Sequence, residues 1–321
     1  MTAPLVTSMA CATLSCPEPV EAIRMMTDTW DWEVFCTGAI DQGTAALWGI
    51  APGSAGDRFT IVRSRGMDRG MIRVVHGGER IRTSPMSTRW SGIEIVVMND
   101  LVGLCKALET DPAFDVVKPV DEADFTHAGA NVHAFFHGRM PGLTHAMFTM
   151  AVTQPESYAF PESPNRVGQI FDVHLDVDNT GPSRAFYGET LGMEMVFDDM
   201  LTEGLFYDTW DLDPETPPVR MSIFKGDAPG FGLGGIEMRS FDRATMDPTP
   251  PVADRFDAGT CMTAFTCRDI AAVYDAVSKS PHAAAISEPM AVDAAPYNGG
   301  LVFCATGPEG ERLEFSEHWQ A

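Results

Sequence analysis

The chain has 321 residues, enough for two domains of about 150 residues each, and 45% of them are apolar, as in folded globular proteins. The 45 Asp and Glu residues outnumber the 22 Lys and Arg residues, and the formal charge of -23 argues against nucleic acid or an anionic membrane as a partner. No stretch reaches the roughly 18 apolar residues of a membrane span. A secretory signal begins with basic residues, and this chain has none before Arg24, so we expect a soluble protein.

The seven cysteines are odd in number and scattered, and they include no C-x-x-C pair. Most stand in apolar surroundings, such as Cys267 in "AFTC" and Cys304 in "LVFC", where a reduced and buried thiol is the commoner state. This use of cysteine favours a cytoplasmic location.

The first half of the chain contains two segments in which a strand and a helix precede further strands. In the first, "MACATLSC" leads into the helix "PVEAIRMMTDTW", and the strands "RFTIVRSRG" and "GMIRVVHGG" follow. In the second, the strand "SGIEIVVMND" and the helix "LVGLCKALET" precede the strands "FDVVKPV", "ANVHAFFHG" and "LTHAMFTMAV". Both segments therefore predict a βαβββ module.

The third segment repeats this order most clearly. Val167–Val177 alternates like a strand, Asn179 supplies a capping side chain, Pro182 suits the first helical turn, and Gly192 ends the helix after Leu191. The strands predicted after this helix are Met193–Phe197, Gly204–Trp210 and Val219–Phe224.

The fourth segment has the same order near the C-terminus. Thr260–Cys267 predicts a strand, "RDIAAVYDAVSK" an amphipathic helix, and Gly300–Ala305 and Arg312–Phe315 two strands around the turn "TGPEGE". Four repeats of one supersecondary unit define the architecture more firmly than any single motif.

Two irregular stretches suggest where these modules are joined. The proline-rich Thr153–Arg166 divides the chain into predicted domains of residues 1–158, with modules one and two, and 159–321, with modules three and four. A second stretch, Gly226–Ala258, is expected to connect modules three and four. Its "GFGLGG" lacks the preceding strand and following helix of a phosphate-binding loop, so we interpret it as a connector.

Two sequences resemble modules of the vicinal oxygen chelate superfamily. They are "FDVHLDVDNTGPSRAFYGETLGMEM", with its helical Phe-Tyr pair and its "LGM" exit, and the closing "GPEGERLEF". The superfamily includes glyoxalases, extradiol dioxygenases, epimerases and antibiotic-binding resistance proteins. The resemblance implies an α+β fold in which four βαβββ modules form two domains with cup-shaped mixed sheets. It also implies a divalent metal in the cup, held by a His on each first strand and a Glu on the last strand.

The resemblance also indicates which residues occupy the ligand positions. Counting back from the Phe-Tyr pair places the first ligand at Asp172, with His174 two residues further along the same strand face. The closing Glu is Glu314. The corresponding positions of the other modules fall on Met262, on Ile93 and near Met9.

These positions offer few ligands for a metal, because a usable site normally has three protein ligands. We therefore expect a metal-free cup in which Asp172, His174 and Glu314 act as acid and base groups. If iron, manganese or zinc is bound, the same three residues are its predicted ligands. The alternation of Asp172, His174 and Asp176 fits the inner face of a cup and a solvent-exposed strand face equally well, and Glu314 could instead pair with Arg312.

The hairpin "NVHAFFHGRMPGLTHAM" brings together His133, His137 and His145. These histidines could form a second site for a metal or a substrate. Alternatively, they lie at a hairpin end or an interface, because no carboxylate at ligand spacing completes the set.

Other residues are candidates for substrate binding. Arg73 falls near the closing-strand position of module one and could bind a substrate carboxylate, unless it lies on the surface. Tyr207, Trp210 and Tyr297 could wall a flat ligand, or they could belong to the core.

From the fold analogy we expect an enzyme that acts on a small oxygenated organic acid, which could be aromatic. It would move a proton next to a carbonyl or perform other lyase or isomerase chemistry. One alternative is a metal-dependent extradiol dioxygenase or glyoxalase, and another is a non-catalytic protein that sequesters a small molecule. The sequence leaves homodimer formation open.

Overall fold

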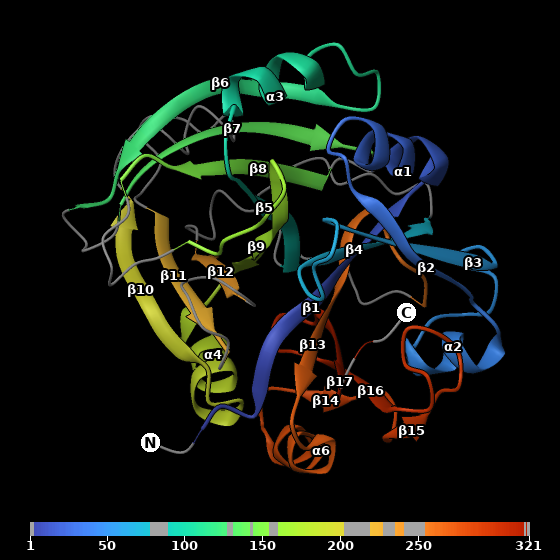
Figure 1. The fold of residues 1–321 in the computed structure, drawn as a ribbon. Coiled ribbons are helices and arrows are strands. Elements are labelled where there is room, and N and C mark those ends of the chain that lie inside the picture. Colours follow the sequence, from blue (N-terminus) through green and yellow to red (C-terminus); the bar gives the residue numbers. More distant parts are fainter. Residues whose placement is uncertain are drawn as a thin grey trace.

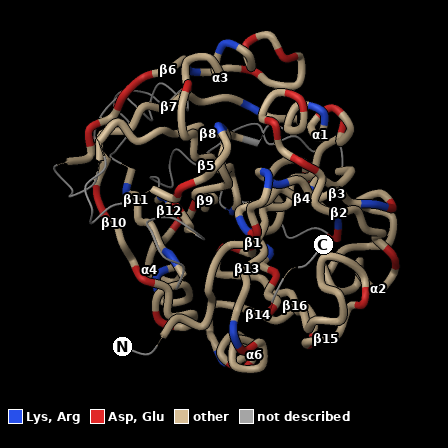
Figure 2. The backbone as a smooth tube through the Cα atoms, in the orientation of Figure 1, with Lys and Arg blue, Asp and Glu red and all other residues tan. Residues whose placement is uncertain are grey.

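The computed structural model of the chain describes residues 3–77, 89–126, 131–141, 144–153, 160–201, 219–226, 235–240, 254–317 and 319. Within these ranges, no helix combines the length and the apolar character needed to cross a membrane. Acidic residues are scattered over many elements, among them α1, β6 and β10 (Figure 2). The large negative charge is therefore spread over the molecule.

Four modules follow one another along the chain, as the repeats predict. The first comprises β1 (Val6–Cys16), α1 (Pro19–Asp28), β2 (Glu33–Ala39), α2 (Gln42–Leu47), β3 (Arg58–Arg63) and β4 (Met71–His76). The second comprises β5 (Arg89–Val97), α3 (Leu101–Leu108), β6 (Asp115–Asp124), β7 (Val132–Met140) and β8 (Thr144–Ala151). The third comprises β9 (Val167–Val177), α4 (Thr180–Arg184), the π-helical turn η2 (Ala185–Thr190), β10 (Glu194–Leu201), β11 (Val219–Lys225) and β12 (Gly235–Ser240). The fourth comprises β13 (Gly259–Cys267), α6 (Ile270–Lys279), β14 (Ala284–Ala285), β15 (Met290–Ala291), β16 (Leu301–Thr306) and β17 (Arg312–Ser316).

The strands of these modules form two mixed sheets (Figure 1). One has the order β14-β16-β17-β13-β1-β4-β3-β2, and the other the order β10-β11-β12-β9-β5-β8-β7-β6. The first module thus shares a sheet with the fourth, and the second with the third. We name the concave face of the former sheet the first cup and that of the latter the second cup.

The predicted grouping of modules one with two and three with four is therefore wrong for the sheets. The antiparallel pairs β1–β13 and β5–β9 join the modules instead. Most of the chain lies between β1 and β13, but their pairing costs little additional free energy. The reason is that the entropic cost of closing a loop grows only slowly with the length of the loop. Local sequence patterns do not show which modules share a sheet.

The two faces of β9 have different environments. Val173, Leu175 and Val177 belong to the largest apolar cluster, together with residues of the helices. Asp172, His174 and Asp176 occupy the alternate positions, which point to the opposite face of the strand, and all three are at most 1% exposed. The acidic and histidine side chains therefore line the second cup and do not face solvent.

The end of the third module differs from the prediction. The stretch interpreted as a connector contains β12, which pairs in parallel with β9. Its sequence, "GIEMRS", places two charged residues in six, which is atypical of a buried strand. The strand predicted over Gly204–Trp210 lies outside the described residues.

The two sequences that carry the family resemblance meet in space. Tyr187 lies in η2, and its hydroxyl donates to Oε1 of Glu311 at 2.5 Å, while Oε2 accepts from the backbone N–H of Glu309 at 2.8 Å. Burial raises the pKa of Glu311 to about 7. This contact ties the third module to the fourth, and so one sheet to the other.

Replacing Glu311 with Gln should stabilise the protein at pH 8 by roughly 3–4 kcal/mol and leave its stability at pH 4 unchanged. Because the folded pKa lies above the unfolded value of about 4.3, the parent loses stability as the pH rises from about 4 to 7. The Gln oxygen can accept from the Glu309 amide, and the Tyr187 hydroxyl can accept from the Gln amide. Urea denaturation at both pH values measures the effect. The exposed Glu189→Gln is the control, and an equal effect of Glu311→Gln at both pH values would contradict the prediction.

Candidate functional site

Three buried side chains in the second cup form a group suited to a metal ion. They are Glu94 on β5, His174 on β9 and Glu237 on β12, and each offers a ligand atom within 4.8 Å of the others. None of the three residues is more than 2% exposed. We call this group the triad.

The register of three neighbouring strands positions the triad. On the parallel pair β12–β9, Glu237 lies opposite His174, and on the antiparallel pair β5–β9, Glu94 lies opposite Asp172. Paired residues point to the same face of a sheet, as do residues two apart along a strand. The triad and Asp172 therefore share the inner face of the second cup.

Gly92 separates His174 from a second histidine. It lies opposite His174 on β9 and opposite His145 on β8. A Cβ added at Gly92 would lie 2.5 Å from the backbone oxygen of His145 and 2.9 Å from Nδ1 of His174, so the position has no room for a side chain. The two imidazole rings face each other across the gap, with centroids 5.7 Å apart, and Nε2 of His145 is hydrogen-bonded to Nδ1 of His137 at 2.8 Å.

Gly92→Ala should therefore displace His174 and lower the metal affinity of the triad by about 10–100-fold, the range found when groups that orient metal ligands are altered. Isothermal titration with Zn²⁺ or Mn²⁺ measures the change. Gly188→Ala is the matched control, because its Cβ would meet only Phe224, at an ordinary 3.5 Å. A folded Gly92→Ala protein with unchanged affinity would show that the gap does not set the position of His174.

The triad and Asp172 carry polar atoms that none of the described residues satisfies. Within the described part of the chain, both carboxylate oxygens of Asp172, both ring nitrogens of His174 and Oε1 of Glu94 and Glu237 have no hydrogen-bond partner. Buried polar atoms are rarely left so, which points to a missing partner. Three ligands from one face of a sheet and this set of orphaned atoms fit a divalent cation.

The electrostatics of the site point the same way. Burial, reinforced by the charge of Glu237, raises the pKa of Glu94, and burial with the charges of Glu94 and Glu237 raises that of Asp172. Burial raises the pKa of Glu237 to about 7, although the Arg239 guanidinium opposes the rise. Burial also lowers the pKa of His174, which keeps the imidazole in the neutral form that binds metals. A cation at the triad would stabilise the carboxylates as anions.

Arg239 is a buried cation beside the triad, two residues after Glu237 on β12. Its Nε donates to Oδ1 of Asp176 at 2.9 Å, and its Nη2 donates to Oγ of Ser91 at 2.5 Å. Its Nη1 lies 3.8 Å from Oε1 of Glu237. This network fixes the end of β12 against β9 and β5.

The wall of the second cup is apolar and rich in aromatic rings. Ile223 on β11 lies opposite Glu237 on β12 and opposite Phe197 on β10. Ile223 and Phe197 therefore face the same cup as the triad. They belong to one buried cluster, whose other members are Val96, Phe160, Phe171, Leu201, Val219 and Met221. The cup thus combines a polar floor with an apolar wall.

The structure does not bring Glu314 to this site. Asp172 and His174 line the second cup, but Glu314 lies on β17 in the other sheet. The prediction that Glu314 acts together with Asp172 and His174 is therefore wrong. Each Oε of Glu314 accepts a hydrogen bond of 2.9 Å from one Nη of Arg73, and Oε2 also accepts from Trp48 Nε1 at 3.0 Å. Its ion-pair partner is therefore Arg73 and not Arg312.

The predicted substrate-binding residues have other surroundings. Arg73 is fully buried, which excludes a surface position, and its charge is already matched by Glu314. Tyr297 is also buried in the first cup, and its hydroxyl accepts from Nη2 of Arg73 at 3.2 Å. Tyr207 and Trp210 lie outside the described residues.

The three histidines of the hairpin lie inside the second cup and not at an exposed hairpin end. His137 and His145 are hydrogen-bonded to each other beside the triad, and the ring of His133 lies 4.6 Å from that of Phe160. Burial lowers the pKa of His133 to about 4 and that of His137 to about 3. Among the residues that the structure describes, these three form no metal-binding group of their own.

Sequence reasoning missed Glu94 and Glu237. The position chosen in module two was Ile93, one residue before Glu94, and Glu237 fell in the stretch interpreted as irregular. Both residues end a Gly-Ile-Glu tripeptide, Gly92–Glu94 and Gly235–Glu237. A carboxylate within an apolar strand is the signal that could have identified them, because such residues are rarely buried without a role.

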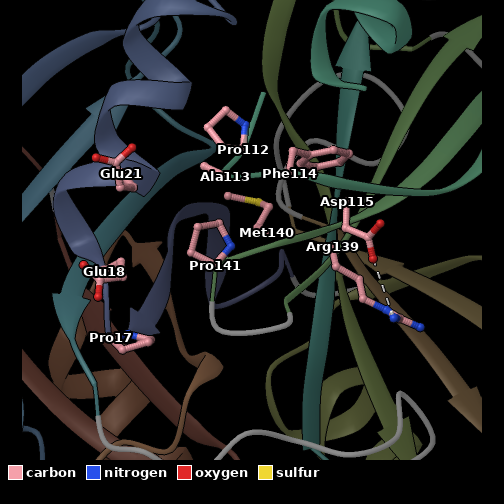
Figure 3. Close-up of a pocket in the computed structure, with 10 residues that line it drawn as sticks. All are labelled: Pro17, Glu18, Glu21, Pro112, Ala113, Phe114, Asp115, Arg139, Met140 and Pro141. Atoms are coloured by element: carbon pink, nitrogen blue, oxygen red, sulfur yellow. Dashed lines mark ion pairs between the residues drawn. The ribbon is translucent and has the colours of Figure 1, made fainter. Parts of the chain in front are cut away.

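A surface pocket lies between the start of α1 and the β6–β7 strand pair (Figure 3). It has a volume of about 570 Å³ and is lined by Pro17, Glu18, Glu21, Pro112, Ala113, Phe114, Asp115, Arg139, Met140 and Pro141. Arg139 and Asp115 form an ion pair of 3.8 Å across part of it. None of the residues that line it belongs to the triad, so the triad is the candidate functional site.

Two of the solved structures that are similar to this chain have nearly the same extent. Glyoxalase I from Zea mays has 11% identity and a TM-score of 0.61, over 97% of this chain and 92% of that one. A putative dioxygenase from Bacillus subtilis has 11% identity and a TM-score of 0.60, over 98% of this chain and 86% of that one. No family model and no curated protein sequence matches the chain. At such low identity the likeness establishes the fold and not the activity. The chain has the fold of the vicinal oxygen chelate superfamily, built from four βαβββ modules.

Proposed function

We propose that the protein is a metal-dependent enzyme that acts on a small oxygenated molecule in the second cup, moving a proton next to a carbonyl as lyases and isomerases do. The triad is the observation that supports this proposal, and it replaces the expectation of a metal-free cup. A divalent cation held by Glu94, His174 and Glu237 would polarise the substrate oxygens and stabilise the developing negative charge.

Asp172 is the group best suited to accept the proton. It faces the same cup, lies opposite Glu94 in the strand register, and has no hydrogen-bond partner among the described residues for either oxygen. Burial raises the pKa of Asp172, and a cation at the triad would favour the anionic carboxylate that accepts a proton. We assign Asp172 the role of general base.

The apolar wall favours a substrate with an aromatic or other flat apolar part. Phe160, Phe171 and Phe197 offer ring faces and edges that can contact such a group, and they exclude water from the floor of the cup. His137 and His145 are neutral and hydrogen-bonded to each other, which uses one of their two N–H groups, so the pair can donate a single hydrogen bond to a substrate oxygen.

Dioxygenase chemistry is the second candidate, and the similarity to the putative dioxygenase from Bacillus subtilis supports it. The ligand types favour proton transfer instead. Sites for Fe(II) and oxygen usually have two histidines and one carboxylate, whereas the triad has one histidine and two carboxylates, which suits harder cations such as Mn²⁺.

The experiment that tests the proposal is deuterium exchange followed by NMR. Chelator-treated protein is supplied with Mn²⁺, Zn²⁺, Ni²⁺ or Fe²⁺ in D₂O and incubated with 2-keto and 2-hydroxy acids, aromatic ones included. Metal-dependent deuterium uptake next to the carbonyl, lost in Asp172→Asn with its metal retained, is the expected result. Oxygen consumption with ring cleavage would favour the dioxygenase, and a ligand that binds and is recovered undeuterated would favour a sequestering protein.

A further inference from the structure

The two cups are built on the same strand order, so their positions can be compared by register. In the second cup, Glu237 on the closing strand lies opposite His174. In the first cup, Glu314 on the closing strand β17 lies opposite Ala264 on β13. Glu314 therefore corresponds to Glu237, and Ala264 takes the place of the histidine ligand.

The central strand pairs extend this comparison. Gly92 and Glu94 on β5 lie opposite His174 and Asp172. On β1, Cys11 lies opposite Ala264, and Thr13 lies opposite Met262. Thr13 therefore corresponds to Glu94, and Met262 corresponds to Asp172.

Of the triad, the first cup has thus kept only the closing glutamate. Thr13 and Ala264 offer no carboxylate and no imidazole, so the residues present do not fit a divalent metal.

A cation of the protein itself stands at this glutamate. Arg73 lies on β4 opposite Thr13, at the register position that Met147 occupies opposite Glu94 in the second cup. Its two Nη atoms donate to the two Oε atoms of Glu314 at 2.9 Å each, and both side chains are fully buried. The planar guanidinium and the carboxylate form a two-point ion pair, the geometry in which such pairs are strongest.

Aromatic side chains complete the enclosure of Arg73. The guanidinium carbon lies 4.9 Å from the ring centre of Trp48, 5.0 Å from that of Trp319 and 5.5 Å from that of Phe59. Contacts of this kind stabilise a desolvated cation. The same rings belong to the apolar cluster of the first cup and fill the space above the ion pair.

We propose that Arg73 takes the place of a metal ion in the first cup. The guanidinium neutralises Glu314 and joins the closing strand of the first module to that of the fourth, across 241 residues of sequence. The first cup is thereby a structural unit, and the two cups, as far as the structure describes them, hold one metal site and not two. The role of Arg73 is independent of the reaction, and only the count of one metal rests on the proposed function.

Metal counting by mass spectrometry of protein saturated with Zn²⁺ tests this proposal. The parent and Glu314→Gln should each bind one ion per chain, and Glu237→Gln should bind none. Transferring the second cup's residues in the triple variant Thr13→Glu, Arg73→Met and Ala264→His should raise the count to two. A parent that binds two ions, or a Glu314→Gln protein that loses one, would overturn the proposal.

A double-mutant cycle measured by thermal unfolding tests the role of Arg73 independently. It is needed because the triple variant could fail to fold. Arg73→Met should lower the unfolding midpoint by on the order of 10 °C, and adding Glu314→Gln should restore most of that loss. Additive effects of the two substitutions would overturn the role of Arg73. A parent that binds no metal would contradict the proposed function alone, since the cycle still decides the role of Arg73.

Discussion

Glu237→Gln should deprive the protein of its metal, with a dissociation constant for Zn²⁺ or Mn²⁺ raised by at least about 100-fold, more than the loss of a group that only orients a ligand. The substitution keeps the shape of the side chain but removes one of the two negative charges of the triad. It also replaces a strong oxygen ligand with a neutral amide, which binds hard cations weakly. Isothermal titration of chelator-treated protein measures the change.

The second cup provides the candidate ligand and the first cup provides the matched control. Glu314→Gln makes the same chemical change at the register-equivalent position of the other sheet, where the carboxylate is bound to Arg73. It should leave the metal affinity unchanged. If Glu237→Gln and Glu314→Gln affect the affinity equally, the triad is not the site.

Arg73→Met should lower the free energy of unfolding by about 3–5 kcal/mol, the usual cost of removing one partner of a buried ion pair. The reason is that Glu314 would be left buried without its cation, while Trp48 and Tyr297 alone cannot balance a full negative charge. Denaturant unfolding, monitored by tryptophan fluorescence and circular dichroism, measures the loss.

Two further variants show whether the loss arises from the ion pair. Arg65→Met removes an exposed arginine that pairs with Asp31 at the surface, and it should cost less than about 1 kcal/mol. The double variant Arg73→Met with Glu314→Gln should be more stable than Arg73→Met alone, because no unmatched charge remains. If Arg73→Met is as harmless as Arg65→Met, the guanidinium does not compensate Glu314.

Much of the fold follows from local sequence. Val167–Val177 was predicted as a strand with the bounds that the structure gives it, Asn179 accepts from the backbone N–H of Gly181, and Gly192 ends the helix with a positive φ of 71°. Such signals act over a few residues, so one sequence suffices to detect them. The choice between β13 and any other strand as partner of β1 depends on surfaces that only the folded chain brings together, and the prediction of module pairs was wrong there.

The site was harder to predict than the fold. His174 was placed on the correct strand, but its alternation with apolar residues could not distinguish the inside of a cup from solvent. The position chosen in module two missed Glu94 by one residue, because β5 and β9 are paired with register shifts, one of them between Glu94 and Ile95. A shift of one residue exchanges the two faces of a strand, and counting from a helix cannot detect it.

The pairing of Arg73 with Glu314 illustrates the same limit. The two residues were recognised as closing-strand positions of modules one and four, and each was assigned a separate role in binding substrate or transferring protons. Their charges match across the first cup only because those two modules share a sheet. The pairing of modules therefore decides which candidate residues act together.

The central claim is that Glu94, His174 and Glu237 hold a metal, and anomalous X-ray diffraction from crystals grown with Zn²⁺ tests it most directly. One strong anomalous peak is expected in the second cup, about 2.0–2.2 Å from a carboxylate oxygen of each glutamate and from a ring nitrogen of His174. The absence of a peak at the triad, or a peak at Glu314 in the first cup, would show that these three residues do not form the metal site.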